Sequence, residues 1–231
     1  VVCGLSLVSQ VFATIDPSVR CTFLVEDGAP IAAGDKLAII EGDARSLLAG
    51  ERTALNLLQR ACAVASKTSA YVSQAAGRLR ITDTRKTMPG LRALDRYAVR
   101  CGGGHNHRND LGAGVLIKET HIRWAGSLEA AIKGARDYAP HTLRICCEVE
   151  NVQEATRAVE AGADALLLDN MNDAEVKEAV ALVGGRAFIE VSGGITLDRI
   201  ARLAQSGADA VSVGALTHSA AAVDLSMLME G

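Results

Sequence analysis

The chain has 231 residues, which is the size of one large domain or of one domain with a small appendage. Hydrophobic residues make up 49% and charged residues 22%, and this globular composition excludes disordered and collagen-like proteins. The net charge is −3 and aromatic residues make up only 3%, so we expect no nucleic-acid partner. No apolar run reaches the about 20 residues of a membrane helix, so we expect no membrane contact.

Six cysteines are spread along the chain without a CxxC motif: Cys3, Cys21, Cys62, Cys101, Cys146 and Cys147. We interpret them as buried thiols, because a chain with a sizeable core needs no disulfide framework. The first residues carry no basic segment and no cleavage site of a signal peptide. We therefore expect a cytoplasmic protein. The sequence opens in mid-pattern without an initiator Met, so we expect either a fragment or the first ordered part of a longer chain.

The first 50 residues are predicted to form a small β-rich unit. Phe23–Glu26 and Lys36–Glu41 are short strand candidates, and the Gly- and Pro-containing segment between them predicts turns. A long helical pattern follows over Ser46–Ala76, where apolar residues recur at steps of three and four.

Beyond Gly77, short apolar segments alternate with helical patterns. Seven segments are strand candidates: Leu79–Asp83, Ala98–Cys101, Val115–Lys118, Leu143–Val149, Ala165–Asp169, Ala187–Val191 and Ala210–Val213. The clearest helical patterns between them are Val152–Ala161, Asp173–Val183 and Leu197–Gln205. Several strands are apolar on both faces, as buried parallel strands are. This alternation predicts an α/β fold with a parallel sheet.

An internal repeat supports a barrel. Residues 161–169 and 206–214 share a pattern in which a helix ends at Gly, the chain turns through Ala-Asp, and a buried strand follows. The two copies are 45 residues apart. A sheet of such units that closes on itself is a TIM-like barrel, and seven strands would make it incomplete. An open doubly wound sheet is the alternative.

Polar residues collect where the predicted strands end. They are Asp83–Lys86, Gly102–Arg108, Lys118, Glu148, Asp169–Asn170, Ser192–Gly194 and Gly214–Ala215. Because barrel enzymes build their sites from the carboxyl ends of the strands, we expect the active site there.

Positive charge is concentrated in one region. Ten of the 24 Lys and Arg residues lie within residues 78–123, together with only four acids. Arg85, Lys86 and Lys118 stand beside strand ends and predict a pocket for a small polyanion, since guanidinium groups bind carboxylates and phosphates bidentately. A solvated helix face explains the arginines at four-residue steps better: Arg92, Arg96 and Arg100.

Glycine turns end the last two predicted strands, at Ser192-Gly193-Gly194 and at Gly214-Ala215. Glycine lets backbone N–H groups approach an anion closely, and the loops after the last strands are the usual phosphate site of barrels. We expect a phosphate to bind at these turns.

Glu148 and Asp169 end neighbouring strands, where they could form structural ion pairs or hold ribose hydroxyls and Mg²⁺. We favour the functional interpretation. The spacing of His105, His107 and His121 fits no structural zinc site, and His107 with Arg108 is a better candidate for contact with an anion.

A set of motifs extends along the whole chain: Glu51–Asn56, Asp83–Thr87, Pro89–Leu91, Tyr97–Gly104, Asn106–Arg108, Val115–Lys118, Glu148–Asn151, Leu168–Asn170, Val191–Ile195 and Val213–Ser219. In this order they closely resemble quinolinate phosphoribosyltransferase, also called carboxylating nicotinate-nucleotide pyrophosphorylase. Departures from the family pattern occur at Thr120, Cys146 and Cys147, and they remove no residue of the expected site.

The resemblance implies an α/β sandwich domain over residues 1–62, on which residues 217–231 pack, and a seven-stranded incomplete α/β barrel over residues 63–216. Members of the family begin upstream of Val1, so we expect the sandwich to be truncated. The implied enzyme is a pentosyltransferase of NAD biosynthesis. It converts quinolinate and phosphoribosyl pyrophosphate, with Mg²⁺, to nicotinate mononucleotide, pyrophosphate and CO₂.

The resemblance also implies roles for individual residues. The quinolinate carboxylates and the pyrophosphate would lie among Thr84, Arg85, Lys86, His107, Arg108 and Lys118. Glu148 and Asp169 would face ribose and metal and, with Lys118, form the catalytic set. The 5′-phosphate would lie at Ser192, Gly193, Gly194, Val213, Gly214 and Ala215. The family implies a homodimer in which Arg52 of each chain completes the neighbour's site.

Two other functions fit parts of the sequence. Lys118 at the end of an apolar strand also fits a Schiff-base aldolase, whose lysine must be neutral. The basic region Arg78–Arg123 fits a module that binds nucleic acid or a partner, which would show a steep salt dependence.

Overall fold

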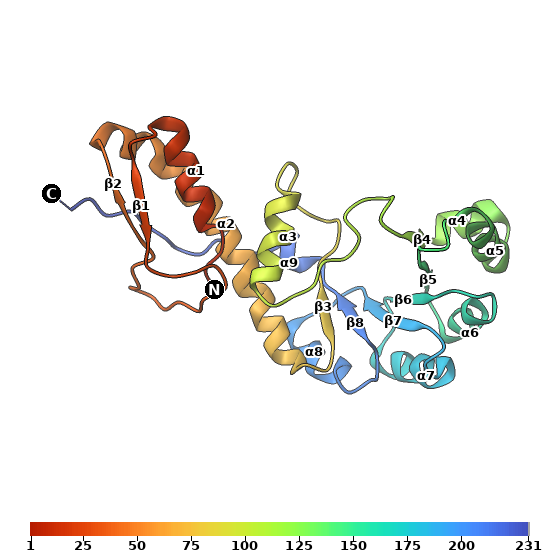
Figure 1. Ribbon diagram of the computed structural model, residues 1–231. Helices are drawn as coiled ribbons and strands as arrows, with labels where there is room; N and C mark the ends of the chain where they lie inside the picture. The colour runs from red at the N-terminus through yellow and green to blue at the C-terminus, as the bar shows by residue number, and fades with distance from the viewer. Residues whose placement is uncertain (231) are drawn as a thin grey trace. The chain divides into compact units, whose positions relative to one another are not determined.

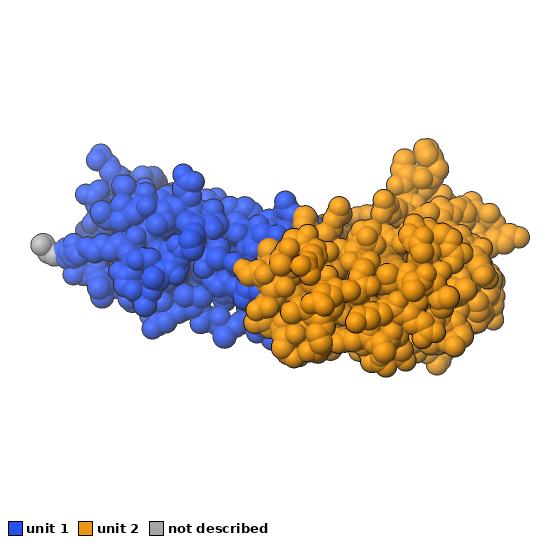
Figure 2. Space-filling model, turned by 90° about the horizontal axis from the view of Figure 1, so that it is seen from below, with its two compact units in different colours: residues 1–70, 86–104, 215–231 blue, residues 71–85, 105–214 orange. Residues whose placement is uncertain are grey.

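The computed structural model describes residues 1–230, which divide into two compact units (Figure 2). The first, here called the small unit, comprises residues 1–70 and 86–104 and the chain from Ala215 onward. The second, here called the barrel unit, comprises residues 71–85 and 105–214. None of the helices in the described chain is long and apolar enough to cross a membrane.

The small unit contains helices and a two-stranded sheet (Figure 1). Its elements are α1 (Leu5–Ile15), β1 (Arg20–Phe23), β2 (Ala38–Glu41), most of α2 (Ala44–Ala75), α3 (Arg92–Cys101) and α9 (Ala215–His218). The strands pair antiparallel, with Arg20 opposite Glu41. Alternate residues of both strands are half-buried, so one face of this small sheet packs against the helices.

Apolar residues of α1 and α2 form the core of this unit. Phe12 is almost fully buried, and a Cβ at Gly50 would lie 2.6 Å from its ring, so the glycine permits a close approach of the two helices. The C-terminal residues Val223, Leu225 and Met227 pack against this core. Helix α1 was not expected from the sequence, where the segment was assigned to a β-rich unit.

A buried ion pair joins α2 and α3. Arg60 Nε lies 3.0 Å from Asp95 Oδ1, and its Nη2 lies 2.9 Å from Oδ2, while the Asp95 side chain is fully buried. The Arg60 guanidinium group thus offsets the cost of burying the Asp95 carboxylate away from water, with two parallel hydrogen bonds.

The barrel unit alternates strands with helices. Its strands are β3 (Arg80–Thr82), β4 (Val115–Ile117), β5 (Ile145–Val149), β6 (Ala165–Asp169), β7 (Phe188–Ser192) and β8 (Ala210–Ser212). Its helices are α4 (Glu119–Ala125), α5 (Leu128–Tyr138), α6 (Val152–Glu160), α7 (Asp173–Val183) and α8 (Leu197–Leu203). The predicted α/β architecture is confirmed.

The strands form one parallel sheet in the order β3-β8-β7-β6-β5-β4, and in Figure 1 it curves as an incomplete barrel with helices outside. A one-residue parallel bridge from Thr82 to His105 adds a seventh position beside β3. The predicted strand at Ala98–Cys101 is wrong. That segment ends α3, because Asp95, Ala98 and Val99 bury one face at helical spacing.

The sequence repeat has a structural explanation at the amino ends of the strands. Asp164 Oδ2 accepts the backbone N–H of Ile145 at 2.7 Å, and Asp209 Oδ2 accepts that of Ile189 at 2.8 Å. Each Ala-Asp turn therefore ties the start of its own strand to a strand beside it. The repeated aspartates therefore stabilise the sheet. They lie at the amino ends of the strands, opposite the carboxyl ends where the predicted site residues lie.

Candidate active site

The predicted site residues of the barrel unit follow the carboxyl ends of its strands. They are Thr84, Arg85, His107, Arg108, Lys118, Glu148, Asp169, Ser192, Gly193, Gly194, Val213 and Gly214. Since the sheet is parallel, the ends of neighbouring strands lie side by side at one edge. These residues therefore share one end of the barrel unit.

Asp83 organises the end of β3. Its side chain is fully buried and accepts Asn106 Nδ2 at 2.6 Å and the backbone N–H of His107 at 2.7 Å. The backbone N–H of Asp83 donates to the carbonyl of His105 at 3.1 Å. A buried carboxylate thus holds the segment that carries His107 and Arg108.

His107 contacts a buried acid from another strand. Its Nε2 lies 3.3 Å from Glu190 Oε2, and its Nδ1 accepts the backbone N–H of Arg108 at 2.7 Å. The hydrogen bond to Glu190 raises the pKa of His107, while burial and Arg108 act against the increase. The Nδ1 contact requires that the proton of the neutral ring be on Nε2, facing Glu190.

Two arginines come close to each other in this region. Burial lowers the pKa of Arg108, and the nearby charge of Arg85 lowers it further. Arg108 Nη1 donates to the carbonyl of Gly114 at 2.9 Å, which fixes its guanidinium group. Two like charges held near each other favour the binding of an anion between them.

Lys118 and Glu148 end adjacent strands β4 and β5 and form an ion pair between Lys118 Nζ and Glu148 Oε2. The Lys118 side chain is 46% exposed and that of Glu148 is 14% exposed. The ammonium group is therefore held by a carboxylate yet remains accessible to a ligand.

Asp169 lies opposite Ser192 at the ends of β6 and β7. Asp169 Oδ2 accepts Asn170 Nδ2 at 2.8 Å, and Asn170 donates its backbone N–H to the carbonyl of Ser192 at 3.0 Å. Asn170 adopts a left-handed conformation with φ 56°. A Cβ at Gly193 would lie 2.2 Å from Asn170 Oδ1, so only glycine fits against this turn.

The three other predicted residues belong to the small unit. Arg52 lies on α2 with its side chain 71% exposed. The Thr217 hydroxyl donates a hydrogen bond to the backbone carbonyl of Lys86 at 2.8 Å. Ala215 is the first residue of α9. Their roles in substrate binding stay predictions.

Three residues at this end of the barrel unit were missed by the sequence analysis: Asp83 as an organiser, Glu190 and Arg199. Glu190 lies in mid-strand, and its Oε1 is buried without a hydrogen-bond partner in the described residues. An acid within an otherwise apolar strand is the sequence signal that could have identified it. Arg199 donates to the carbonyls of Met171 at 2.5 Å and Gly193 at 3.3 Å, so it holds together the loops after β6 and β7.

Cys146 faces the same interior. Burial, and then the Glu190 carboxylate, raise the pKa of its thiol. Both effects disfavour the thiolate form, which is the nucleophilic form of a cysteine.

The donor set at the ends of β5 and β6 fits Mg²⁺. Asp169 Oδ1 accepts no hydrogen bond within residues 1–230, and Glu148 offers a second carboxylate at a neighbouring strand end. Carboxylate oxygens together with substrate oxygens are the ligands that Mg²⁺ takes in such sites.

An open hollow of about 770 Å³ lies at the opposite, amino-terminal ends of the strands. Its acids Asp164 and Asp209 accept backbone N–H groups of the sheet, and Arg136 pairs with Asp164 at 2.8 Å. These charged groups therefore have structural roles, and we do not interpret this hollow as the active site.

Family models match both parts of the chain. The model of the quinolinate phosphoribosyl transferase C-terminal domain matches residues 64–228, and that of the N-terminal domain matches residues 1–62.

Similar proteins have been described in bacteria and plants. A probable nicotinate-nucleotide pyrophosphorylase (carboxylating) of Bacillus subtilis is 39% identical over 225 residues, which are 97% of this chain and 78% of that protein. Quinolinate phosphoribosyltransferase (decarboxylating) 1b of Nicotiana tabacum is 36% identical over 100% of this chain and 71% of its own length. The crystal structure of NadC from Streptococcus pyogenes superposes with a TM-score of 0.93 at 42% identity, covering 97% of this chain and 80% of that one. The chain therefore belongs to the quinolinate phosphoribosyl transferase family.

Proposed function

We propose that this protein transfers the phosphoribosyl group of phosphoribosyl pyrophosphate to quinolinate with loss of one carboxylate. The products are nicotinate mononucleotide, pyrophosphate and CO₂, a step of NAD biosynthesis. The observation that carries this proposal is the set of cationic and acidic side chains at the carboxyl ends of the strands, in the domain that the family model matches.

Arg85, Arg108 and His107 are the proposed quinolinate pocket. The two guanidinium groups repel each other when the pocket is empty, and a dicarboxylate between them would replace that repulsion with charge-assisted hydrogen bonds. The contacts of its Nε2 with Glu190 and of its Nδ1 with the backbone N–H of Arg108 fix the orientation of the His107 ring.

The turn at Ser192-Gly193-Gly194 is the proposed site of the 5′-phosphate. Gly193 and Gly194 both have positive φ and lack a Cβ, so an anion can approach the backbone N–H groups of this turn closely. Arg199 binds the Gly193 carbonyl and thereby holds this turn in place before the phosphate binds.

The chemical step needs electrostatic stabilisation more than a protein nucleophile. The bond between ribose C1′ and pyrophosphate breaks as the pyridine nitrogen attacks, and positive charge develops on the ribose ring. Glu148 and Asp169 lie at adjacent strand ends, where their carboxylates stabilise that charge. Lys118 stabilises the departing pyrophosphate. The cationic pyridine ring then stabilises the electron pair that the leaving CO₂ releases at ring carbon C2, and a proton from water binds to that carbon.

Mg²⁺ would bind to Asp169 and Glu148 with the pyrophosphate oxygens, where it would neutralise the charge of the leaving group. The two carboxylates would hold the metal ion beside the ribose. Asn170 fixes the orientation of the Asp169 side chain.

We also propose a homodimer in which Arg52 enters the neighbouring site. Its side chain is 71% exposed on α2, with Nη2 3.9 Å from Glu51 Oε1, so the guanidinium group can reach a second chain. A cytoplasmic location agrees with the six free cysteines of this chain, which a reducing compartment preserves.

The ion pair of Lys118 disfavours the aldolase alternative. A Schiff-base lysine requires an apolar or cation-crowded pocket, whereas Lys118 pairs with the carboxylate of Glu148 and its side chain is 46% exposed.

The proposal is tested with quinolinate whose 2-carboxylate carries an isotopic label. We expect release of labelled CO₂ that requires both phosphoribosyl pyrophosphate and Mg²⁺, with nicotinate as an inactive control substrate. Trapping of the protein by borohydride with carbonyl substrates, and no release of CO₂, would contradict it.

A further inference from the structure

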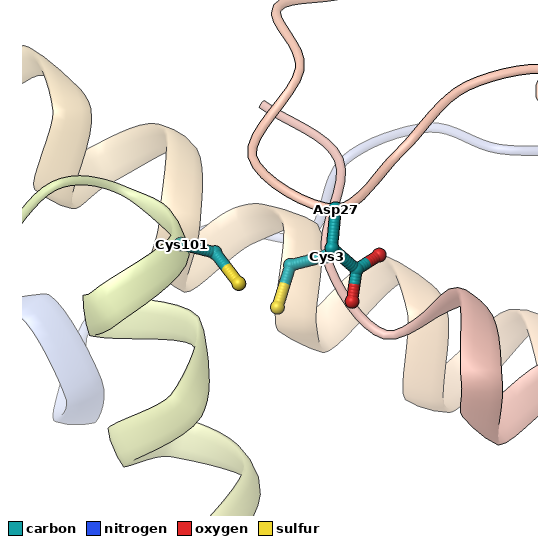
Figure 3. Close-up of side chains that lie close together, drawn as sticks. All are labelled: Cys3, Asp27 and Cys101. Atoms are coloured by element: carbon teal, nitrogen blue, oxygen red, sulfur yellow. The ribbon is translucent and has the colours of Figure 1, made fainter.

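We propose that the small unit holds a Zn²⁺ site formed by Cys3, Asp27 and Cys101. The two Sγ atoms and a carboxylate oxygen of Asp27 all lie within 4.8 Å of one another. Figure 3 shows the two sulfur atoms facing each other, with the Asp27 carboxylate beside Cys3. All three residues belong to the small unit, and the site is independent of the proposed reaction.

Backbone contacts bring the three segments together. The N–H of Val2 donates to the carbonyl of Ala29 at 2.9 Å, and the N–H of Gly28 donates to the carbonyl of Val2 at 2.8 Å. A Cβ at Gly28 would lie 3.6 Å from the carbonyl oxygen of Cys101, so this turn also packs against the end of α3. The ligands are therefore held by the fold and not by flexible side chains alone.

Hydrogen bonds from the start of α1 and from Tyr97 fix the Asp27 carboxylate. Its Oδ2 accepts the N–H of Gly4 at 2.9 Å and the hydroxyl of Tyr97 at 2.8 Å, and its Oδ1 accepts the N–H of Leu5 at 3.1 Å. No Lys, Arg or His of residues 1–230 forms an ion pair with this carboxylate. One lone pair of Oδ1 remains for a cation, and the hydrogen-bonded groups fix its direction.

The donor set selects the metal. Two thiolates with one carboxylate suit Zn²⁺, while Mg²⁺ and Ca²⁺ prefer sites made only of oxygen. Cys3 is fully buried, whereas Cys101 and Asp27 are only partly buried, so the ion can enter from their side and keep a water as its fourth ligand. Binding would convert two thiols to thiolates and release two protons.

Metal titration of the reduced chain tests this proposal. We expect one Zn²⁺ per chain and, with Co²⁺ as the probe, a thiolate-to-metal charge-transfer band. Cys101→Ser is expected to lower the affinity by at least about 100-fold and to remove most of that band. Cys21→Ser is the matched control, because it removes a half-buried thiol of the same unit outside the cluster and should leave binding unchanged.

Two further measurements separate metal binding from a purely structural role of these residues. Tyr97→Phe, which removes only the hydroxyl that orients Asp27, should lower the affinity about 10-fold. Zn²⁺ at about 100 times Kd should raise Tm by about 5–10 °C, and this increase should be absent in Cys101→Ser. The proposal is overturned if the reduced chain binds no Zn²⁺ saturably, if Cys101→Ser binds it as tightly as the unaltered chain, or if the native protein carries a Cys3–Cys101 disulfide.

Discussion

The ion pair of Lys118 with Glu148 is the residue-scale feature on which the proposed chemistry depends. The ammonium group has a fixed partner within the protein and an exposed side toward a ligand. In this position it can act on a leaving pyrophosphate without a large movement.

Replacement of Lys118 by Met is expected to lower kcat by about 10²–10³, because one electrostatic contact to the transition state is lost. Tm should change little, since the side chain is nearly half exposed. Lys133→Met, which alters an exposed lysine of α5, is the control and should retain full activity. Turnover of Lys118→Met equal to that of the unaltered enzyme would remove Lys118 from the mechanism.

The His107–Glu190 contact predicts a pH dependence of stability. Because Glu190 raises the pKa of His107, the charged pair stabilises the fold fully at pH values below the ordinary histidine pKa of 6.5. That contribution is lost as the pH rises through the raised pKa of the folded state. In Glu190→Gln the pKa of His107 should fall, and the loss of stability with rising pH should shrink. NMR titration of the ring and urea unfolding at several pH values measure both, and an unchanged titration curve would show that Glu190 does not control this histidine.

At the scale of elements, the turn after β7 requires glycine at one position and is held by a hydrogen bond from Arg199 of α8. Gly193 has φ +87°, and a side chain there would collide with Asn170, while Arg199 holds the Gly193 carbonyl. The phosphate turn is therefore shaped by its neighbours and not only by its own sequence.

Gly193→Ala should raise the KM for phosphoribosyl pyrophosphate at least about 10-fold, because the turn and Asn170 must move apart. Gly134→Ala is the matched control, since a Cβ at this position of α5 meets no atom within 4 Å. This control should keep its KM and stabilise the protein by about 0.5–1 kcal/mol. An unchanged KM in Gly193→Ala would exclude the turn as a phosphate site.

Helices and parallel strands of the barrel unit could be predicted because their periodicity is local. The predicted helix Asp173–Val183 has the same bounds as α7, and the long pattern Ser46–Ala76 corresponds closely to α2. The strand expected at Ala98–Cys101 is helical. A segment of four residues is too short to distinguish the periodicity of a helix from that of a strand, and the buried face of α3 begins earlier in the chain, at Asp95. Helix α1 was missed because its apolar residues are buried against residues of α2, which are distant in sequence.

The same limit applies to the candidate site. The strand-end acids and bases could be read from the chain, because every parallel strand points its carboxyl end to one edge. Glu190 and Arg199 could not, since their importance comes from His107 and from two loops that only the fold brings to them.

At the scale of the whole molecule, the proposed dimer can be tested by mixing two inactive variants. Arg52→Ala and Lys118→Met should each lose most activity, and a refolded mixture should regain about a quarter of the active sites, because a mixed dimer has one intact site. Failure of the mixture to regain activity, with dimers present in sedimentation, would show that Arg52 acts within its own chain or not at all.

The proposed reaction requires both anionic substrates to bind at the carboxyl ends of the barrel strands. A crystal structure with quinolinate and a non-reactive analogue of phosphoribosyl pyrophosphate would locate both ligands. We expect the quinolinate carboxylates against Arg85 and Arg108, and the 5′-phosphate at Gly193 and Gly194. Ligand density in the hollow beside Asp164 and Asp209 instead, with the carboxyl ends empty, would contradict it.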